Sequence, residues 1–340
     1  MLATLRQKYA PHLAELDQIM LEELTRWRSR EIERFWSLTH AQLQRHGKQL
    51  RSVLSLMMTD HLGGEPRAVV PAAASVEFYH AASLVLDDVQ DHSEIRRGEP
   101  TISAGASAST AVNVALFLRS LSYHMINRCT EQDPAERLRV HQELDHAATH
   151  LILGQSIDIG WHENWYGSYR DFPYLRMIEG KSGALFGCAA AVGACAGKAD
   201  PEVIGAARDY GTAFGVLYQM VDDYLDVFGD ETVLRRPRFD DFREGKITAP
   251  VISLLSALRD QGREKDVGLV LAGLADRDPA CDWEWLLDLM REHNVADTLR
   301  KQISERAAHL AEPAIGPGPS GRAGNFAQLV ELITAPACSD

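Results

Sequence analysis

The sequence predicts an all-α protein, and three observations point to that fold class. The 14 prolines leave gaps long enough for whole helices, whose interiors exclude proline. Neither Asn-Gly nor Asp-Gly occurs, so the strongest short signal of a β-hairpin is absent. Apolar residues recur every three or four positions, which is typical of amphipathic helices, and alternation of strand length is hard to find.

The expected helices follow one another between short breaks. Residues 13–43 form the first amphipathic stripe, with Leu13, Leu16 and Met20 on one face. The longest uncharged stretch, residues 182–197, is rich in glycine and alanine and predicts a buried helix. Breaks are expected at 63–66, 97–100, 133–134, 171–173, 200–201 and 229–241, and a last loop at 316–321 precedes a short helix around 326–333.

Composition and charge exclude several classes of protein. With 45% hydrophobic and 24% charged residues, the chain is neither disordered, nor collagen-like, nor a disulfide scaffold. The net charge of −13 argues against a broad nucleic-acid-binding surface. An anionic substrate therefore requires a local cationic pocket or metal ions that offset the acidic field.

The cysteines and the apolar stretches indicate the cellular compartment of the protein. Five scattered cysteines without a CxxC pair indicate reduced thiols rather than disulfides or a zinc site. The N-terminal residues contain no apolar signal-peptide region, and the stretch 182–197 is too short to span a bilayer. We therefore expect a cytoplasmic protein without a transmembrane segment. The cysteines are Cys129, Cys188, Cys195, Cys281 and Cys338.

Two segments, 87–91 and 222–226, contain Asp-Asp-x-x-Asp after an apolar run. On a helix the first and last aspartate of each triplet share a face, where like charges repel. A solvated acidic patch is one interpretation. A magnesium site is the other, because Mg²⁺ binds one or two carboxylates together with substrate phosphates. Two such triplets favour Mg²⁺ ions that hold a diphosphate between two helices. The carboxylates are Asp87, Asp88, Asp91, Asp222, Asp223 and Asp226.

The chain resembles the trans-isoprenyl diphosphate synthase (polyprenyl synthetase) family over roughly Gln44 to Leu255. The motifs that carry the resemblance are the aspartate-rich segments at 77–91 and 218–226, Arg96-Arg97-Gly98-Glu99-Pro100-Thr101, Gly154-Gln155-Ser156-Ile157-Asp158, Lys181-Ser182 and Gly245-Lys246-Ile247-Thr248-Ala249-Pro250. Upstream, Gly47-Lys48-Gln49-Leu50-Arg51 is similar to a Gly-Lys-Arg-x-Arg-Pro motif, from which Gln49 and Ser52 depart.

The resemblance implies an isoprenoid synthase bundle of about ten core helices around a deep central cavity. It implies one domain over residues 1–340, made of an N-terminal helical region (1–43), a catalytic core (44–312) and a C-terminal loop and short helix (313–340). The implied reaction joins isopentenyl diphosphate head to tail to an allylic diphosphate and releases diphosphate. A homodimer is also implied.

The resemblance also assigns site residues. The six aspartates would bind about three Mg²⁺ ions that hold the allylic diphosphate. Arg96, Lys181 and Lys246 would add cationic contacts to that group, and Gln219 matches a polar position beside the metal cluster. The diphosphate of isopentenyl diphosphate would be bound by Lys48, Arg51, His80 and Arg97.

Some positions depart from the family pattern or remain open. In the segment 234–241, Arg236 stands where many members have lysine, and Phe239 replaces a small residue. The segment 111–117 lacks a Gly-Asp pair that many members have. Gln155 and Asp158 fit either a structural role or a place on the cavity wall.

Helical geometry bears on the length of the product. Residues four, five and eight positions before Asp87 lie on roughly the same helix face and are Ser83, Ala82 and Tyr79. Two small residues followed by a bulky one favour a C20 to C25 product, with geranylgeranyl diphosphate preferred.

Two other functions stay open at the level of the sequence. A terpene cyclase or aromatic prenyltransferase of the same fold would also ionise an allylic diphosphate with Mg²⁺. A cyclase usually lacks a second aspartate triplet and has no use for an isopentenyl diphosphate site. A regulatory subunit of a heteromeric synthase would be expected to lose aspartates, whereas this chain keeps all six.

Overall fold

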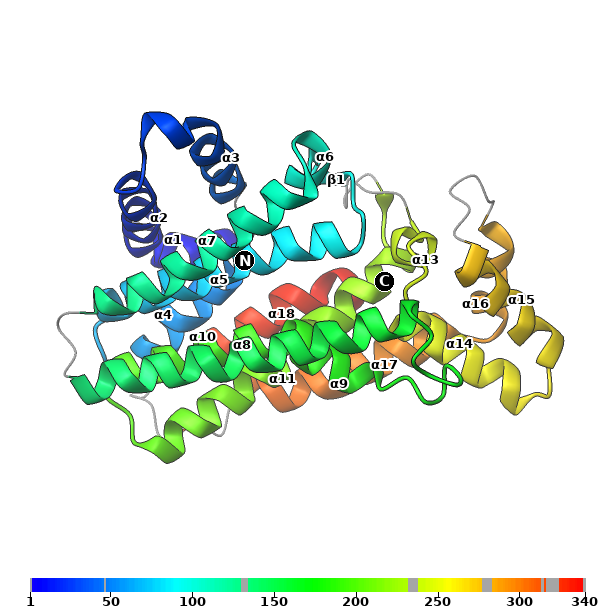
Figure 1. The fold of residues 1–340 in the computed structure, drawn as a ribbon. Coiled ribbons are helices and arrows are strands. Elements are labelled where there is room, and N and C mark those ends of the chain that lie inside the picture. Colours follow the sequence, from blue (N-terminus) through cyan, green and yellow to red (C-terminus); the bar gives the residue numbers. More distant parts are fainter. Residues whose placement is uncertain are drawn as a thin grey trace. The chain divides into compact units, whose positions relative to one another are not determined.

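The described part of the chain is mostly helical, which confirms the predicted all-α fold class (Figure 1). The structure is a computed structural model, and it describes residues 2–45, 47–129, 134–231, 238–276, 283–312, 315 and 324–338. The helices are α1 (Leu2–Lys8), α2 (Ala10–Thr25), α3 (Glu33–Gln44), α4 (Leu50–His61), α5 (Val70–Gln90), α6 (Ile102–Gly105), α7 (Ala108–Asn127), α8 (Pro134–His162), α9 (Tyr174–Ile178), α10 (Ala184–Ala196), α11 (Pro201–Phe228), α13 (Asp240–Arg243), α14 (Ala249–Asp260), α15 (Glu264–Asp276), α16 (Glu284–Glu292), α17 (Val295–Ala311) and α18 (Gly324–Cys338). The short 3₁₀-helices η1 (Arg30–Ile32) and η2 (Pro66–Val69), the short π-helix η3 (Glu179–Gly183) and the strands β1 (Ile95–Arg96) and β2 (Glu99–Pro100) complete the described elements.

Contacts along the backbone group the chain into two compact units. The first unit contains residues 1–149, 184–212 and 314–325, and the second contains 150–183, 213–313 and 326–340. The expected single domain, with its N-terminal region, core and C-terminal segment, stays a prediction.

In the first unit, α5 packs along α7, and α4 packs along α10. Every residue of α10 is buried, as predicted for the uncharged stretch. Close packing there depends on glycine, because a Cβ atom at Gly193 would lie 2.8 Å from the Cβ of Met58. Small residues therefore let α10 approach α4 closely.

The helical segment formed by η2 and α5 is apolar, so it bears on the expectation that the chain has no transmembrane segment. By length and composition, residues Pro66–Gln90 could cross a bilayer, and 61% of their most apolar window is buried inside the structure. A core helix passes the same test, so this finding is weak support for a membrane span.

Two local features differ from the sequence expectation. The stripe over 13–43 is interrupted between α2 and α3, where Trp27 and Ile32 are exposed. Strands β1 and β2 form a minimal antiparallel hairpin that the search for Asn-Gly missed. Its turn consists of Arg97 (φ 56°) and Gly98 (φ 80°), and this pair of positive φ values is what a two-residue hairpin loop demands.

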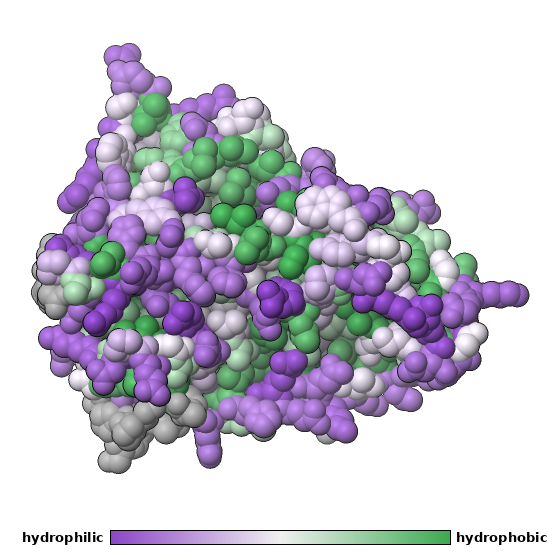
Figure 2. Space-filling view, turned by 60° about the horizontal axis from the view of Figure 1, so that its bottom comes forward, coloured by the Kyte–Doolittle hydropathy of each residue, from purple (hydrophilic) through white to green (hydrophobic). Residues whose placement is uncertain are grey.

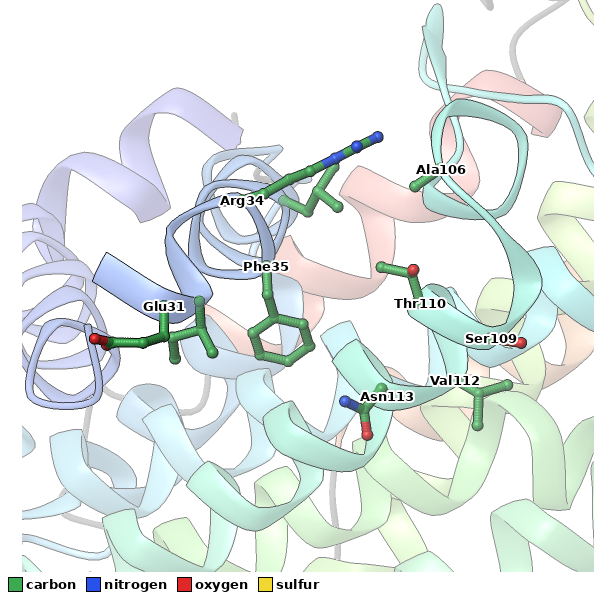
Figure 3. Close-up of a pocket in the computed structure, with 10 residues that line it drawn as sticks. Glu31, Arg34, Phe35, Ala106, Ser109, Thr110, Val112 and Asn113 are labelled. Carbon is green, nitrogen blue, oxygen red and sulfur yellow. The ribbon is translucent and has the colours of Figure 1, made fainter. Parts of the chain in front are cut away.

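The first unit also has a pocket of about 620 Å³ between α3 and the start of α7 (Figure 3). Phe35 points from α3 toward α7, where its ring lies 5.5 Å from that of Phe117. Asn113 and Thr110 of α7 line the other side. None of the predicted site residues lines this pocket.

In the second unit, α14 packs against α15, α16 and α17. Phe242 and Trp283 lie edge to face, 4.8 Å between ring centroids, and help bury the side of α13. On the face of the molecule shown in Figure 2, hydrophobic residues are interspersed with hydrophilic ones.

Candidate active site

The first aspartate motif lies at the carboxyl end of α5. Asp87 and Asp88 are in the last turn, and Asp91 caps the helix with its backbone N–H donating to the Asp87 carbonyl at 2.8 Å. Carboxylates are unfavourable there, because the negative end of the helix dipole adds to their mutual repulsion. A compensating cation is therefore required at this position.

Arg96 of β1 supplies part of that compensation. Its Nη2 donates to Asp87 Oδ2 at 2.9 Å, and its Nε donates to Asp88 Oδ1. The Asp88 side chain is only 5% exposed. Burial raises the pKa of Asp88, Arg96 opposes this rise, and the charges of Asp87 and Asp91 add to it. The hairpin thus holds a guanidinium against the predicted metal-binding carboxylates.

Arg97, the next residue of the hairpin, turns toward the segment before α4. Its Nη1 donates to the carbonyl of Arg45. A Cβ atom at Gly47 would lie 2.7 Å from Nη2 of Arg97, so a larger residue there would require this guanidinium to shift. The left-handed backbone at Arg97 therefore gives its side chain a different direction from that of Arg96.

Arg51 and His80 meet between α4 and α5. Nη1 of Arg51 lies 3.2 Å from Nε2 of His80, and the guanidinium stacks 4.3 Å from the ring centroid of Phe186. Since arginine only donates, Nε2 of His80 accepts and its Nδ1 carries the proton. Burial, followed by the charges of Arg51 and Arg97, holds the pKa of His80 well below its usual value. His80 is therefore neutral, and the positive charge of this cluster comes from the arginines.

Ser52 explains one departure from the family pattern. Glu77 of α5 accepts hydrogen bonds from the Ser52 hydroxyl at 2.6 Å and from its backbone N–H at 3.3 Å. A proline at this position has no N–H to donate. The Glu77 carboxylate thus satisfies the amino end of α4, which has no side-chain cap of its own, and fixes the turn that carries Arg51.

In the second unit, both carboxylate oxygens of Asp223 accept hydrogen bonds from other groups of the protein. Its Oδ1 accepts from Gln219 Nε2 at 2.8 Å, and its Oδ2 accepts from the Tyr174 hydroxyl at 2.7 Å and the Ala249 N–H at 3.1 Å. Burial, with the nearby charge of Asp241, raises the pKa of Asp223 to about 7. Asp222, its neighbour on α11, is half-buried and is the more accessible carboxylate.

Asp226 anchors the segment that leads to Lys246. Its Oδ2 accepts from the Asp241 N–H at 3.3 Å, and its carbonyl accepts from the Phe239 N–H at 2.9 Å. Phe239 has a φ of 61°, a left-handed conformation that favours glycine, and its side chain is buried. This backbone explains why a small residue is expected there. Arg235 and Arg236 lie outside the described residues.

Lys181 lies in the short π-helix η3. Its Nζ is 2.6 Å from Oδ2 of Asp158, a buried carboxylate of α8. The π-helix packs closely on α8, because a Cβ atom at Gly154 would lie 2.7 Å from the backbone of Gly180. Next to Lys181, the Ser182 hydroxyl donates to Gln219 Oε1 at 2.5 Å. Of the two open positions, Asp158 therefore pairs with a predicted cation, while Gln155 is buried on the same helix.

Lys246 follows the turn at Gly245. Its Nζ lies 2.5 Å from Oε2 of Glu244 and 4.0 Å from Oδ1 of Asp241. The indole N–H of Trp161 donates to the Gly245 carbonyl at 3.0 Å and holds this turn against α8. Sequence reasoning missed Trp161 and Tyr174, and it included Glu77 only as part of the first aspartate-rich segment, because the roles of these residues depend on contacts distant in sequence.

Carboxylate oxygens are the donors that Mg²⁺ prefers, so both motifs fit this metal chemically. Over the described ranges, no group of three His, Cys, Asp or Glu side chains forms a ready metal site. Mg²⁺ usually keeps several waters and is bound by one or two carboxylates together with substrate phosphates. The assignment of the six aspartates as metal ligands stays a prediction.

The predicted chain-length residues lie on α5. Tyr79 is 4% exposed and Ala82 is 2% exposed, whereas Ser83 is half-buried and donates to the His80 carbonyl at 2.8 Å. Burial raises the pKa of Tyr79, and a hydrogen bond with Arg119 of α7 opposes the rise. The Tyr79 ring is therefore held between α5 and α7.

Comparison with known proteins places the chain in a family. The model of the polyprenyl synthetase family matches residues 33–269. The short chain isoprenyl diphosphate synthase of Methanothermobacter thermautotrophicus is 32% identical over 228 residues, which are 67% of this chain and 69% of that protein. The geranylfarnesyl diphosphate synthase of Aeropyrum pernix is 35% identical over 229 residues, 66% of this chain and 70% of that protein.

Solved structures agree with this assignment. The crystal structure of a decaprenyl diphosphate synthase from Rhodobacter capsulatus superposes with a TM-score of 0.83 at 28% identity, covering 98% of this chain and 99% of that one. The family match spans most of the chain and contains both aspartate motifs. The chain therefore belongs to the polyprenyl synthetase family and is an all-α trans-prenyltransferase.

Proposed function

We propose that this enzyme condenses isopentenyl diphosphate head to tail with an allylic diphosphate and releases diphosphate. The observation that carries the proposal is the presence of two chemically different clusters of charged side chains. Aspartates with Arg96 suit a metal-bound diphosphate, and the cluster of Arg51, His80 and Arg97 suits a diphosphate held by cations alone. An elongating prenyltransferase needs both.

Members of this family are magnesium-dependent prenyltransferases. In this proposal the six aspartates would bind about three Mg²⁺ ions together with the allylic diphosphate, with Asp87, Asp88, Asp91 and Asp222 as ligands and Asp223 and Asp226 supporting them. When bound, the metal stabilises the negative charge that develops on the leaving diphosphate. Arg96, Lys181 and Lys246 are the cations of this chain that we assign to the same leaving group.

The proposed chemistry needs no side-chain nucleophile. Cleavage of the allylic C–O bond gives diphosphate and an allylic cation, and the double bond of isopentenyl diphosphate attacks that cation. The new cation loses a proton, with the released diphosphate as the proposed acceptor. Apolar walls exclude the water that would otherwise capture either cation.

The alternative of a terpene cyclase or aromatic prenyltransferase is less well supported. Such an enzyme has one diphosphate to bind, and it gives no role to the second cluster around Arg51 and His80. A regulatory subunit is also less well supported, because every aspartate of both motifs is retained.

The test is a product assay. The protein is mixed with Mg²⁺, isopentenyl diphosphate and each allylic diphosphate in turn, and the products are identified by mass. We expect consumption of isopentenyl diphosphate and a linear C20 to C25 diphosphate, mainly geranylgeranyl diphosphate. Cyclic products without such consumption favour a cyclase, and no turnover favours the regulatory subunit.

Two broader proposals accompany the reaction. We propose a homodimer, since the described part of α7 exposes Val112 and Leu116 one turn apart, an apolar stripe that a second copy can cover. We also propose a cytoplasmic location, in keeping with the free cysteines Cys129, Cys188, Cys195 and Cys338. We expect no nucleic-acid partner.

A further inference from the structure

Gln49 has an environment that its exposed neighbour Lys48 lacks. It is 7% exposed, although it lies in the short loop before α4. Its backbone is left-handed, with φ 51° and ψ 34°. This conformation is uncommon for a residue with a Cβ atom and costs about 1 kcal/mol, so surrounding contacts must hold it.

The oxygen and the nitrogen of the Gln49 side-chain amide each form a hydrogen bond with a charged side chain of the two N-terminal helices. Nη2 of Arg6, on α1, donates to Oε1 at 2.9 Å. Nε2 donates to Oδ1 of Asp17, on α2, also at 2.9 Å. An amide side chain has both an acceptor oxygen and donor N–H groups, so Gln49 accepts from the cation and donates to the anion at the same time. An arginine here would place two guanidinium groups together, which accounts for the departure of Gln49 from the family pattern.

The helices that supply these partners precede the family match, which begins at residue 33. Further contacts attach them to α4 and η2 of the same unit. The Tyr9 hydroxyl donates to Oδ2 of Asp60 at 3.1 Å, and Arg67 pairs with Glu15 at 3.0 Å. The hydrogen bonds to Gln49 connect helices α1 and α2 to residues 47–51.

The backbone at Gln49 sets the position of its functional neighbours. Its carbonyl accepts the first helical hydrogen bond of α4, from the Val53 N–H at 3.0 Å. Lys48 precedes it, and Arg51, which contacts His80, follows two residues later. Any rotation at Gln49 therefore moves Lys48 and Arg51, two of the three cations assigned to isopentenyl diphosphate.

We infer that Gln49, clamped by Arg6 and Asp17, is a positioning residue for the isopentenyl diphosphate site, and that helices α1 and α2 thereby control the affinity for this one substrate. The inference rests on the proposed function, because it presumes that residues 47–51 bind the second diphosphate. It gives a role to a segment that the family match does not include.

The test is steady-state kinetics with the two substrates varied separately. Gln49→Leu keeps the side-chain volume and removes both hydrogen bonds. We expect the KM for isopentenyl diphosphate to rise about tenfold, which corresponds to about 1.4 kcal/mol, while kcat and the allylic KM change by less than about twofold. A merely structural loss would lower the amount of active enzyme and leave both KM values unchanged.

Matched variants on one helix sharpen the test. Asp17→Ala should reproduce the KM rise, whereas Glu15→Ala, which removes the ion pair to Arg67, should not. Combining Arg6→Met with Gln49→Leu should give no larger rise than Gln49→Leu alone, because both act through one amide. If Gln49→Leu does not fold, Asp17→Ala and Arg6→Met carry the same comparison.

Three outcomes overturn the inference. One is an unchanged isopentenyl diphosphate KM in the Gln49 and Asp17 variants, and another is an equal rise in both KM values. The third is a rise of the same size in Glu15→Ala. Each can be observed only if the wild-type enzyme consumes isopentenyl diphosphate. Wild-type protein that does not consume it contradicts the proposed function itself, and the inference with it.

Discussion

Adjacent aspartates in the second motif have opposite environments. Asp222 is half-buried and chemically accessible, whereas Asp223 is buried and accepts three hydrogen bonds from Gln219, Tyr174 and Ala249. A motif of identical residues therefore combines a carboxylate suited to a metal with one that holds the protein together. The sequence shows the identity of these residues, but only the contacts distinguish their roles.

The accessible carboxylate should dominate catalysis. Replacing Asp222 by Ala removes a proposed metal ligand, and we expect kcat to fall on the order of 100-fold to 1000-fold, as for the loss of other groups that stabilise a developing charge. The measurement is turnover at saturating Mg²⁺ and substrates. Asp209→Ala, on the exposed side of the same helix, is the control and should retain activity. An active Asp222→Ala enzyme contradicts the metal assignment.

The buried carboxylate should make stability depend on pH. The pKa of Asp223 is about 7 in the folded protein against 3.8 ordinarily, so the folded state binds this proton more tightly than the unfolded chain. The resulting stabilisation is complete below pH 3.8 and is lost as the pH rises through about 7. Without Mg²⁺, the wild-type Tm should fall between pH 5 and pH 8 more than the Tm of Asp223→Asn. If Tm falls equally with pH in both proteins, Asp223 is not the cause of the pH dependence.

The tyrosine on α5 should set the length of the product. Tyr79→Ala removes the bulky group eight residues before Asp87, and we expect products longer than those of the wild type. Tyr79→Phe keeps the ring and loses only the contact with Arg119, so its products should keep the wild-type length. The measurement is the mass of the products. If the product masses of Tyr79→Ala equal those of the wild type, Tyr79 does not limit the length of the product.

At the scale of elements, the contact between α8 and η3 should tolerate no side chain at Gly154. An added Cβ meets the backbone of Gly180 at 2.7 Å, and backbone cannot move aside as a flexible side chain can. We expect Gly154→Ala to lower the free energy of unfolding by about 1–3 kcal/mol.

A second helical glycine provides the control for this prediction. A Cβ atom at Gly268, on α15, meets nothing within 4 Å, so Gly268→Ala should raise stability by up to about 1 kcal/mol through helix propensity. Urea unfolding of both variants measures the difference. Similar effects of the two substitutions would mean that the space at Gly154 is not limiting.

Helices were predictable because their signals are local, and the hairpin was not. Proline spacing and apolar periodicity sufficed for the all-α class, and the uncharged stretch 182–197 predicted the buried helix α10. The β1–β2 hairpin has two-residue strands and a turn in which Arg97 itself takes a positive φ, which no propensity rule favours. Likewise, the motifs led to Arg51 and His80, but Glu77 and Tyr174 act through contacts between distant segments. Such partners are visible only in three dimensions.

At the scale of the whole molecule, the proposed dimer makes a prediction about α7. Leu116 is 52% exposed on the proposed interface, and Leu269 is 59% exposed on α15. Placing a charge in an apolar interface is costly, so Leu116→Asp should convert dimers to monomers, whereas Leu269→Asp should not. Sedimentation equilibrium distinguishes the two species. A monomeric wild type, or a dimeric Leu116→Asp protein, contradicts the proposal.

The hydrogen bonds of Arg96 to Asp87 and Asp88 have a thermodynamic consequence for the binding of Mg²⁺. A bare Mg²⁺ ion must compete with a guanidinium that already neutralises these carboxylates. A magnesium–diphosphate complex instead offers a cation to the aspartates and an anion to the arginine, so that every charge exchanges one partner for another. Each ligand then strengthens binding of the other by the same factor. Magnesium should consequently arrive together with the phosphorylated substrate rather than ahead of it.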